Sequence, residues 1–423
     1  MNRLRLGLGA RDSHAPLPAK EEESLFEWSQ HNKRQSRISE AMQRAHIAVA
    51  ERDLILEGET RQTVGGMNHP GLTKPQRRIP SLDGLRGISI WAVIIAHSAD
   101  HFLFSTVHSH HIRTVLSNCA NLGVTIFFVI SGFLITSILL AEQERTSRIN
   151  VRRFYKKRAI RIIPAFALYT GTILLLCDVS LRQIVYALTF TTSFFFWQAY
   201  KPLQHLWSLS VEEQFYLAWP LIFARGLGDA KRWCWLVLIA CPIIRSILAY
   251  QGLVYLDHAA VLDSIAAGCL LAFYREQIQR KIARVTRSGI IFGIFCLMMP
   301  ILSLVMNKLE SFSWMLVPLT TTVPLFVAVV IGAAIERRDA FLNKGPLVWS
   351  GLLSYSLYLW QQPFLVMDGV LNYFVVRVAL TFAAAYCSYR WVEQPVIHWF
   401  AARDKRAETV SLSVEKQTTT AVL

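Results

Sequence analysis

Long apolar segments separated by short polar ones make up most of the chain from residue 80 onward. Several of them run for about 18 residues or more with almost no charge, which is enough to form a membrane-spanning helix. The pattern predicts an all-α, polytopic membrane protein. About ten spans are expected, near residues 82–104, 119–141, 162–178, 212–224, 233–250, 259–274, 288–306, 314–335, 348–367 and 372–398. The further apolar stretch 183–199 is expected to be interfacial or re-entrant.

The segments between these spans alternate in charge. Segment 142–161 holds eight Lys or Arg against two Glu, and segment 275–287 holds five against one. Segment 251–258 has no Lys or Arg, and 307–313 has only Lys308. By the positive-inside rule, the basic segments are cytoplasmic, which places both termini in the cytoplasm. This orientation requires that residues 183–199 do not cross the membrane.

Polar sequence at both ends sets the expected domain organisation. Residues 1–78 are predicted to be a polar cytoplasmic extension, in which 37–58 has the spacing of an amphipathic helix. Residues 79–400 form the predicted transmembrane domain, and 401–423 a short polar cytoplasmic tail. Met67 is an alternative start, in which case residues 1–66 do not belong to the native protein.

Composition fits a protein embedded in a lipid bilayer. The chain is 53% hydrophobic and has a formal net charge of +15. In a membrane protein such a charge reflects topology and contact with anionic lipid, so we expect no nucleic-acid partner. The seven cysteines show neither CxxC nor zinc spacing, and they are interpreted as small core residues.

Arg86 and His97 stand out because both are ionisable and both fall within the first apolar segment. Eleven residues of helix bring two side chains back to nearly the same face, with the Cα atoms about 16 Å apart. Ionisable residues at membrane depth indicate a functional site. A neutral imidazole is a suitable general base for a hydroxyl nucleophile. Asp83 lies on nearly the same stripe, and the alternative for His97 is a core histidine bonded to a backbone carbonyl.

Arg158 and Arg161 form an RxxR pair at helical spacing, which suits bidentate phosphate contacts. The alternative is positive-inside topology alone. Arg161 adjoins an apolar run and is expected to need a buried anionic partner.

Glu212 and Glu213 follow Ser210 in the segment WSLSVEE. Ser210 is expected to cap a helix here, with Glu213 completing the capping box. Glu212 then has no role in capping, so we expect it to take part in the chemistry or to orient His97.

Two further groups of residues are candidates for helix packing, pocket lining or metal binding. Ser131 and Gly132 lie within a span, where small residues permit close helix packing or line a pocket. His97 and His101 have HxxxH spacing, but no carboxylate stands in the HExxH position, so no metal site is expected.

Six segments together resemble the acyltransferase-3 family of integral membrane acyltransferases. They occur in the order of the family and cover most of residues 80–398. The segments are LDGLRGISIWAVIIAH (82–97), LGVTIFFVISGFLIT (122–136), FYKKRAIRIIP (154–164), HLWSLSVEEQFYLAWP (205–220), SYSLYLWQQP (354–363) and YRWVEQP (389–395).

The resemblance implies a ten-helix domain in the bacterial cytoplasmic membrane that moves an acyl group, commonly acetyl, from acyl-CoA to a hydroxyl of a glycan or lipid-linked sugar. It implies that acyl-CoA is a donor substrate and that no cofactor is resident. It also implies site roles. The expected catalytic residues are His97 and Glu212; those expected to bind the donor are Arg86, Arg158 and Arg161; and the expected pocket residues are Asp83, Ser131, Trp207, Ser208, Tyr358 and Gln361.

Two positions differ from the family pattern. Many members have His where this chain has Gln361, and many carry Arg shortly before the DSIAAG stretch, where this chain has Val261. The identity of the acceptor and of the acyl group therefore stays open. The choice between direct transfer and a covalent acyl-enzyme also stays open, as does the oligomeric state. A transporter or flippase using the same intramembrane charges is the alternative function, although the chain shows no internal repeat of the kind typical of transporters.

Overall fold

The computed structural model describes residues 79–102, 110–199, 201–253, 261–282, 320–337, 341–366 and 373–404. These residues form helices and turns with no strand among them, so the all-α prediction is confirmed for this part of the chain. The expected helix 37–58, the expected span 288–306 and most of the tail 401–423 lie outside the described residues.

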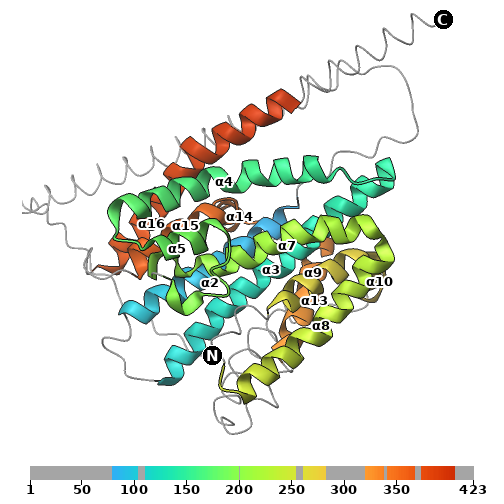
Figure 1. Cartoon of the computed structure of the whole chain (residues 1–423), viewed down its shortest axis with the longest axis horizontal. Coiled ribbons are helices and arrows are strands. Elements are labelled where there is room, and N and C mark those ends of the chain that lie inside the picture. The colour runs from blue at the N-terminus through green and yellow to red at the C-terminus, as the bar shows by residue number, and fades with distance from the viewer. Residues whose placement is uncertain are drawn as a thin grey trace, which may run out of the picture. The chain divides into compact units, whose positions relative to one another are not determined.

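The described helices form a bundle (Figure 1). Their bounds are α2 Pro80–Phe102, α3 His110–Thr146, α4 Val151–Leu176, α5 Leu181–Leu188, α6 Lys201–Gln204, α7 Leu206–Arg225, α8 Leu227–Tyr250, α9 Leu262–Phe273, α10 Arg275–Ile282, α13 Thr322–Arg337, α14 Gly345–Leu352, α15 Ser354–Leu365 and α16 Phe374–Ser388. A short 3-10 turn, Phe196–Gln198, precedes α6, and a π-helical stretch, Tyr389–Glu393, continues α16.

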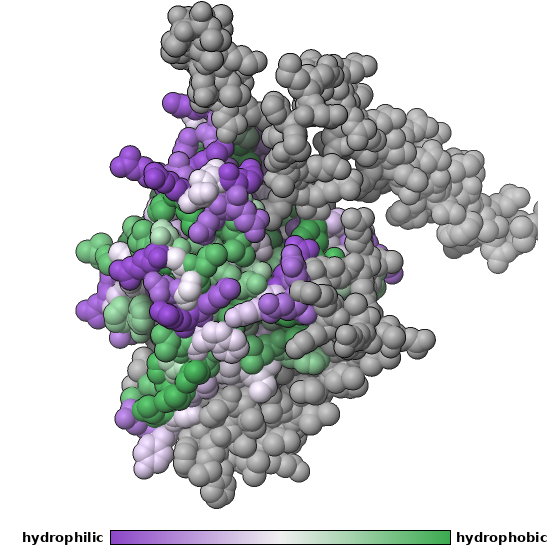
Figure 2. All heavy atoms as spheres, turned by 90° about the vertical axis from the view of Figure 1, so that its right-hand side faces the viewer, coloured by the Kyte–Doolittle hydropathy of each residue, from purple (hydrophilic) through white to green (hydrophobic). Residues whose placement is uncertain are grey.

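Three described helices are long and apolar enough to cross a bilayer. They are α4, α8 and the Asn118–Thr146 part of α3. Many large hydrophobic side chains on their outer faces are exposed, such as Leu175, at 87%, and Leu236, at 65%. Figure 2 shows hydrophobic side chains over much of one face of the described surface. Such exposure is unfavourable in water and is expected where helices face lipid chains.

Two helices begin earlier than the sequence pattern predicts. The helix expected at 162–178 starts at Val151, because the Asn150 side chain accepts a hydrogen bond from the backbone N–H of Arg153 and caps it. Arg158 and Arg161, which precede the expected span, therefore lie inside α4. The helix expected at 212–224 starts at Leu206 and ends at Arg225, where it is followed by Gly226, whose φ of +142° favours glycine.

The expected span 348–367 is two helices instead of one. A break at Leu353 separates α14 from α15. Near the break, Gly351 lies so close to α2 that an added Cβ would be 1.8 Å from the carbonyl oxygen of Asp83. The stretch 183–199 contains only part of α5 and a short 3-10 turn, and each of these is too short to cross a bilayer. This agrees with the prediction that the stretch is interfacial or re-entrant.

Helix α3 packs against α2 on one side and α9 on the other. Two glycines allow the α3–α9 contact, since a Cβ on Gly132 would lie 2.1 Å from the carbonyl oxygen of Ile265. A Cβ on Gly268 would lie 2.0 Å from that of Val129. The expectation that Gly132 permits close helix packing is confirmed.

Replacing Gly132 with alanine is expected to lower the free energy of unfolding by about 1–3 kcal/mol, because the new methyl group meets backbone that must move. Gly171 in α4 is the matched control, since nothing lies within 4 Å of its added Cβ. Gly171→Ala should be neutral or stabilising by up to about 1 kcal/mol. Thermal unfolding in detergent compares them, and equal melting temperatures for the two variants would contradict the close contact.

A buried ion pair joins α8 to α9. Arg245 Nη2 lies 2.7 Å from Asp263 Oδ2, and Thr321 Oγ1 donates to the same carboxylate oxygen at 2.8 Å. Both charged residues are buried. The arginine that faces Asp263 thus comes from α8, and position 261, just before α9, is Val261.

Arg245→Leu is expected to cost about 3–5 kcal/mol of stability, because it leaves the Asp263 carboxylate buried without its cation. The double variant Arg245→Leu/Asp263→Leu should recover much of this loss. Arg232→Leu is the control, since Arg232 forms an exposed pair with Asp229 on the same helix, and its effect should stay within about 0.5 kcal/mol. A melting temperature for Arg245→Leu equal to that of the control would show that Asp263 does not depend on Arg245.

Candidate functional site

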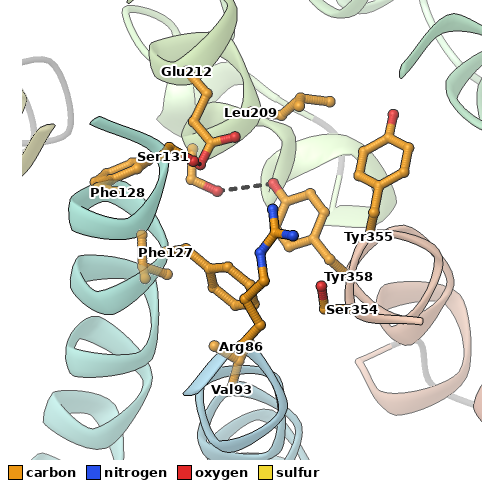
Figure 3. Close-up of a pocket in the computed structure, with 12 residues that line it drawn as sticks. Arg86, Val93, Phe127, Phe128, Ser131, Leu209, Glu212, Ser354, Tyr355 and Tyr358 are labelled. Atoms are coloured by element: carbon orange, nitrogen blue, oxygen red, sulfur yellow. Dashed lines mark hydrogen bonds between the residues drawn. The ribbon is translucent and has the colours of Figure 1, made fainter. Parts of the chain in front are cut away.

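Four helices converge on a pocket (Figure 3). Helix α2 provides Arg86 at one side, and α7 provides Glu212 opposite it. The walls are largely apolar and aromatic, and the polar groups gather around the Arg86 guanidinium. The lining residues are Arg86 and Val93 from α2, Val124, Phe127, Phe128 and Ser131 from α3, Ser208, Leu209 and Glu212 from α7, and Ser354, Tyr355 and Tyr358 from α15.

A hydrogen-bonded network links Glu212 to α3. Ser131 Oγ donates to Glu212 Oε1 at 2.9 Å, and Tyr216 OH lies 3.0 Å from Ser131 Oγ and 3.2 Å from Glu212 Oε2. Glu212 and Tyr216 are four residues apart, so they share one face of α7. The network fixes the carboxylate at the edge of the pocket, beside the Ser131 hydroxyl.

Two arginines lie near this carboxylate. Arg86 and Arg158 are both within electrostatic range of Glu212. The Arg158 guanidinium stacks on the Tyr216 ring, with its Cζ 4.6 Å from the ring centroid. The Arg86 Nε is buried without a hydrogen-bond partner among the described residues. Positive charge from α2 and α4 is therefore concentrated beside one carboxylate, an arrangement able to hold an anionic ligand.

Arg161 lies differently from its partner in the RxxR pair. It is exposed on the surface of α4, and the buried carboxylate of Glu393 lies within its electrostatic range. Its charge also reaches Arg86. Residues three apart lie on the same side of a helix, but only Arg158 stacks against Tyr216 of α7.

His97 lies three turns along α2 from Arg86 and one turn beyond Val93, which lines the pocket. That Arg86 and His97 share one helix is confirmed. The His97 Nδ1 atom lies 3.3 Å from Gln361 Oε1 of α15. The hydrogen bonds of Glu212 go to Ser131 and Tyr216, so direct orientation of His97 by Glu212 does not occur in this structure.

The expected capping box at Ser210 is wrong. Ser210 lies inside α7, where its Oγ donates to the carbonyl oxygen of Leu206 at 2.9 Å. Glu213 Oε1 is buried without a hydrogen-bond partner among the described residues. The apolar residues before Ser210 pack into the core, and this burial extends the helix toward its N-terminus, so the serine bonds to the preceding turn.

The other predicted pocket residues divide into two groups. Ser131, Ser208 and Tyr358 line the pocket, and Ser208 Oγ lies 2.9 Å from Tyr358 OH. Asp83, Trp207 and Gln361 lie outside the lining. Asp83 is in electrostatic range of Arg86, and Trp207 packs edge-on against Phe128, with ring centroids 6.1 Å apart.

Sequence reasoning missed Tyr216, Tyr355 and His205. Tyr216 had a signal, because it follows Glu212 by four residues on one helix. His205 is buried against Tyr169 and Tyr358 and lies within electrostatic range of His97. Carbonyl oxygens of Pro202 and Leu359 lie near its ring, but neither ring nitrogen has a partner with hydrogen-bond geometry in the part of the chain that the structure describes.

The described residues contain no group of three or more His, Cys, Asp or Glu side chains arranged to hold a metal ion. The available chemistry therefore lies in the arginines, the carboxylate, the hydroxyls and His97. This set can bind an anion beside an apolar pocket and can accept a proton from a hydroxyl group.

The fold and the pocket define a helical protein with span-length apolar helices around a charged site. A family model described as an acyltransferase domain matches residues 79–392, which is more than half of the chain. The chain belongs to this acyltransferase-3 family, and the resemblance seen in the six sequence segments is confirmed.

Curated relatives agree with this assignment. O-acetyltransferase OatA of Staphylococcus aureus strain NCTC 8325 / PS 47 is 28% identical over 363 residues, covering 76% of this chain and 57% of the relative. A protein of S. aureus strain COL, provisionally named an O-acetyltransferase, is 30% identical over 371 residues, covering 76% of this chain and 58% of its own. The chain thus spans less than three fifths of the length of these relatives. No solved structure matches the chain.

Proposed function

We propose that this protein is a membrane-embedded O-acyltransferase that moves acetyl from acetyl-CoA to a hydroxyl of a glycan or lipid-linked sugar. The observation that carries the proposal is the convergence of Arg86, Ser131 and Glu212 on one pocket, with Arg158 behind it, inside the region that matches the family. The names of the relatives support acetyl as the transferred group and an oxygen as the acceptor.

The cationic side of the pocket is proposed to take the donor. Arg158 and Arg161 bind phosphates of CoA, since guanidinium groups pair well with phosphate oxygens. Arg86 reaches further into the pocket, where it stabilises negative charge that develops on the thioester oxygen. The apolar walls, among them Phe127 and Leu209, exclude water and so limit hydrolysis of the donor.

His97 is proposed to be the general base. Its imidazole takes the proton of the acceptor hydroxyl as the oxygen bonds to the thioester carbonyl carbon. The carbon–sulfur bond then breaks, and the CoA thiolate receives a proton from the imidazolium. Glu212 keeps Arg86 and Arg158 in place and holds Ser131, so its contribution is to shape the site.

The membrane arrangement belongs to the same proposal. Residues 79–400 form the transmembrane acyltransferase domain with ten spans, both termini face the cytoplasm, and the protein resides in the bacterial cytoplasmic membrane. Acetyl-CoA then meets Arg158 and Arg161 from the cytoplasmic side. The basic segment 142–161 supports this orientation.

Purified full-length protein in lipid vesicles tests the proposal directly. We expect acetyl-CoA plus a hydroxyl acceptor, such as a membrane-glycan fraction, to release free CoA thiol and to gain acetyl ester on the acceptor. Boiled protein is the control. A protein that moves the acceptor across the vesicle membrane without releasing CoA would be a transporter and would overturn the proposal.

A further inference from the structure

Gln361 holds the ring of His97 from the opposite helix. The amide oxygen of Gln361 lies 3.3 Å from His97 Nδ1. A carbonyl oxygen has no proton to donate, so the proton of this hydrogen bond belongs to Nδ1. In a neutral imidazole, a proton on Nδ1 leaves the lone pair on Nε2. The contact therefore selects the tautomer in which Nε2 is the basic atom.

The Gln361 side chain of α15 is fully buried and has one hydrogen-bond partner among the described residues, His97. The amide nitrogen has no partner among them. Tyr358, one turn earlier on α15, lines the pocket. The same helix thus forms part of the pocket wall and holds the histidine beyond it.

We propose that Gln361 is a positioning residue that keeps His97 in the Nδ1–H tautomer, so that Nε2 is the atom that takes the proton of the acceptor hydroxyl. The inference rests on the proposed function. As the acceptor oxygen bonds to the thioester carbon, its proton moves to Nε2 and the C–S bond breaks. The imidazolium returns that proton to the CoA thiolate. Throughout, Nδ1–H donates to Gln361, and this bond strengthens while the ring carries positive charge.

Two substitutions separate positioning from packing. Gln361→Met keeps the size of the side chain but cannot accept a comparable hydrogen bond, so kcat should fall about 10- to 100-fold, as when partners that orient a functional histidine are lost. The KM for acetyl-CoA should stay within about twofold, because the donor-binding arginines are untouched. Gln361→Glu still accepts from Nδ1–H and should keep kcat within about 10-fold of wild type. A packing role predicts the reverse order, because methionine suits a buried site and a carboxylate does not.

Gln362 provides the matched control, since it is the adjacent buried glutamine and donates to the carbonyl oxygen of Lys201 at 3.1 Å. Gln362→Met should keep kcat within about threefold of wild type. If Gln361→Glu does not fold, Gln361→His replaces it, since a neutral imidazole also offers an acceptor nitrogen.

The measurements are kcat and KM for acetyl-CoA in vesicles, with thermal unfolding of every variant. If the wild type is active and the kcat of Gln361→Met equals or exceeds that of the folded variant that keeps an acceptor atom (Gln361→Glu or Gln361→His), the inference is overturned. The proposed function then still stands. A further loss in His97→Ala/Gln361→Met beyond that of His97→Ala also overturns it. A wild type without His97-dependent transfer overturns the proposed function and this inference together.

Discussion

His97→Ala is expected to remove acyl transfer while the protein stays folded. Without the imidazole, no group takes the proton of the acceptor hydroxyl, and loss of a general base lowers kcat by about 100- to 10,000-fold. Binding of acetyl-CoA should change little, because Arg86 and Arg158 keep their positions beside Glu212. The measurement is acceptor-dependent release of CoA thiol, with KM for acetyl-CoA determined separately.

His398 provides the control for this substitution. It is an exposed histidine in the helical stretch 394–404, outside the pocket. His398→Ala should transfer acetyl at the wild-type rate. If His97→Ala retains more than about a third of wild-type kcat, the imidazole is not the base, because a positioned base contributes at least about 100-fold.

The placement of Arg86 and His97 was predictable because it depends on local geometry. A helix repeats every 3.6 residues, and the apolar residues between the two positions fit one uninterrupted helix. The structure has this helix as α2. Gly132 was predictable for a similar reason, since a small residue inside an apolar segment indicates close packing wherever the partner helix lies.

Contacts between distant segments were not predictable in this way. His97 meets Gln361, and Arg245 meets Asp263, because the bundle brings different helices together. No periodicity within one segment specifies which helix faces which. The capping box at Ser210 failed for the same physical reason, because burial of the preceding residues against other helices outweighed the local capping signal.

Glu212→Gln is expected to have the second large effect. The amide has nearly the same shape and still bonds to Ser131 and Tyr216, but it no longer compensates the charges of Arg86 and Arg158. Removing the charged partner from a buried set costs about 3–5 kcal/mol, because Arg86 and Arg158 lose the carboxylate that they share. Arg86 and Arg158 then lose the attraction of this carboxylate, while Arg161 still repels both, and they leave their places at the pocket. We expect a lower melting temperature and a kcat/KM reduced by about 100-fold, which corresponds to about 2.7 kcal/mol.

Glu213→Gln is the matched comparison, one residue further on the same helix. Glu213 lacks a hydrogen bond at Oε1 and lies in electrostatic range of both Glu212 and Arg158. Its neutralisation removes a repulsion from Glu212, so stability should be unchanged or higher, and kcat/KM should stay within about threefold. If the two variants lose stability and activity equally, net charge in this part of α7 matters rather than the carboxylate bonded to Ser131. If only Glu212→Gln loses both, the counter-ion role is specific to Glu212, because the two substitutions remove the same charge from adjacent positions.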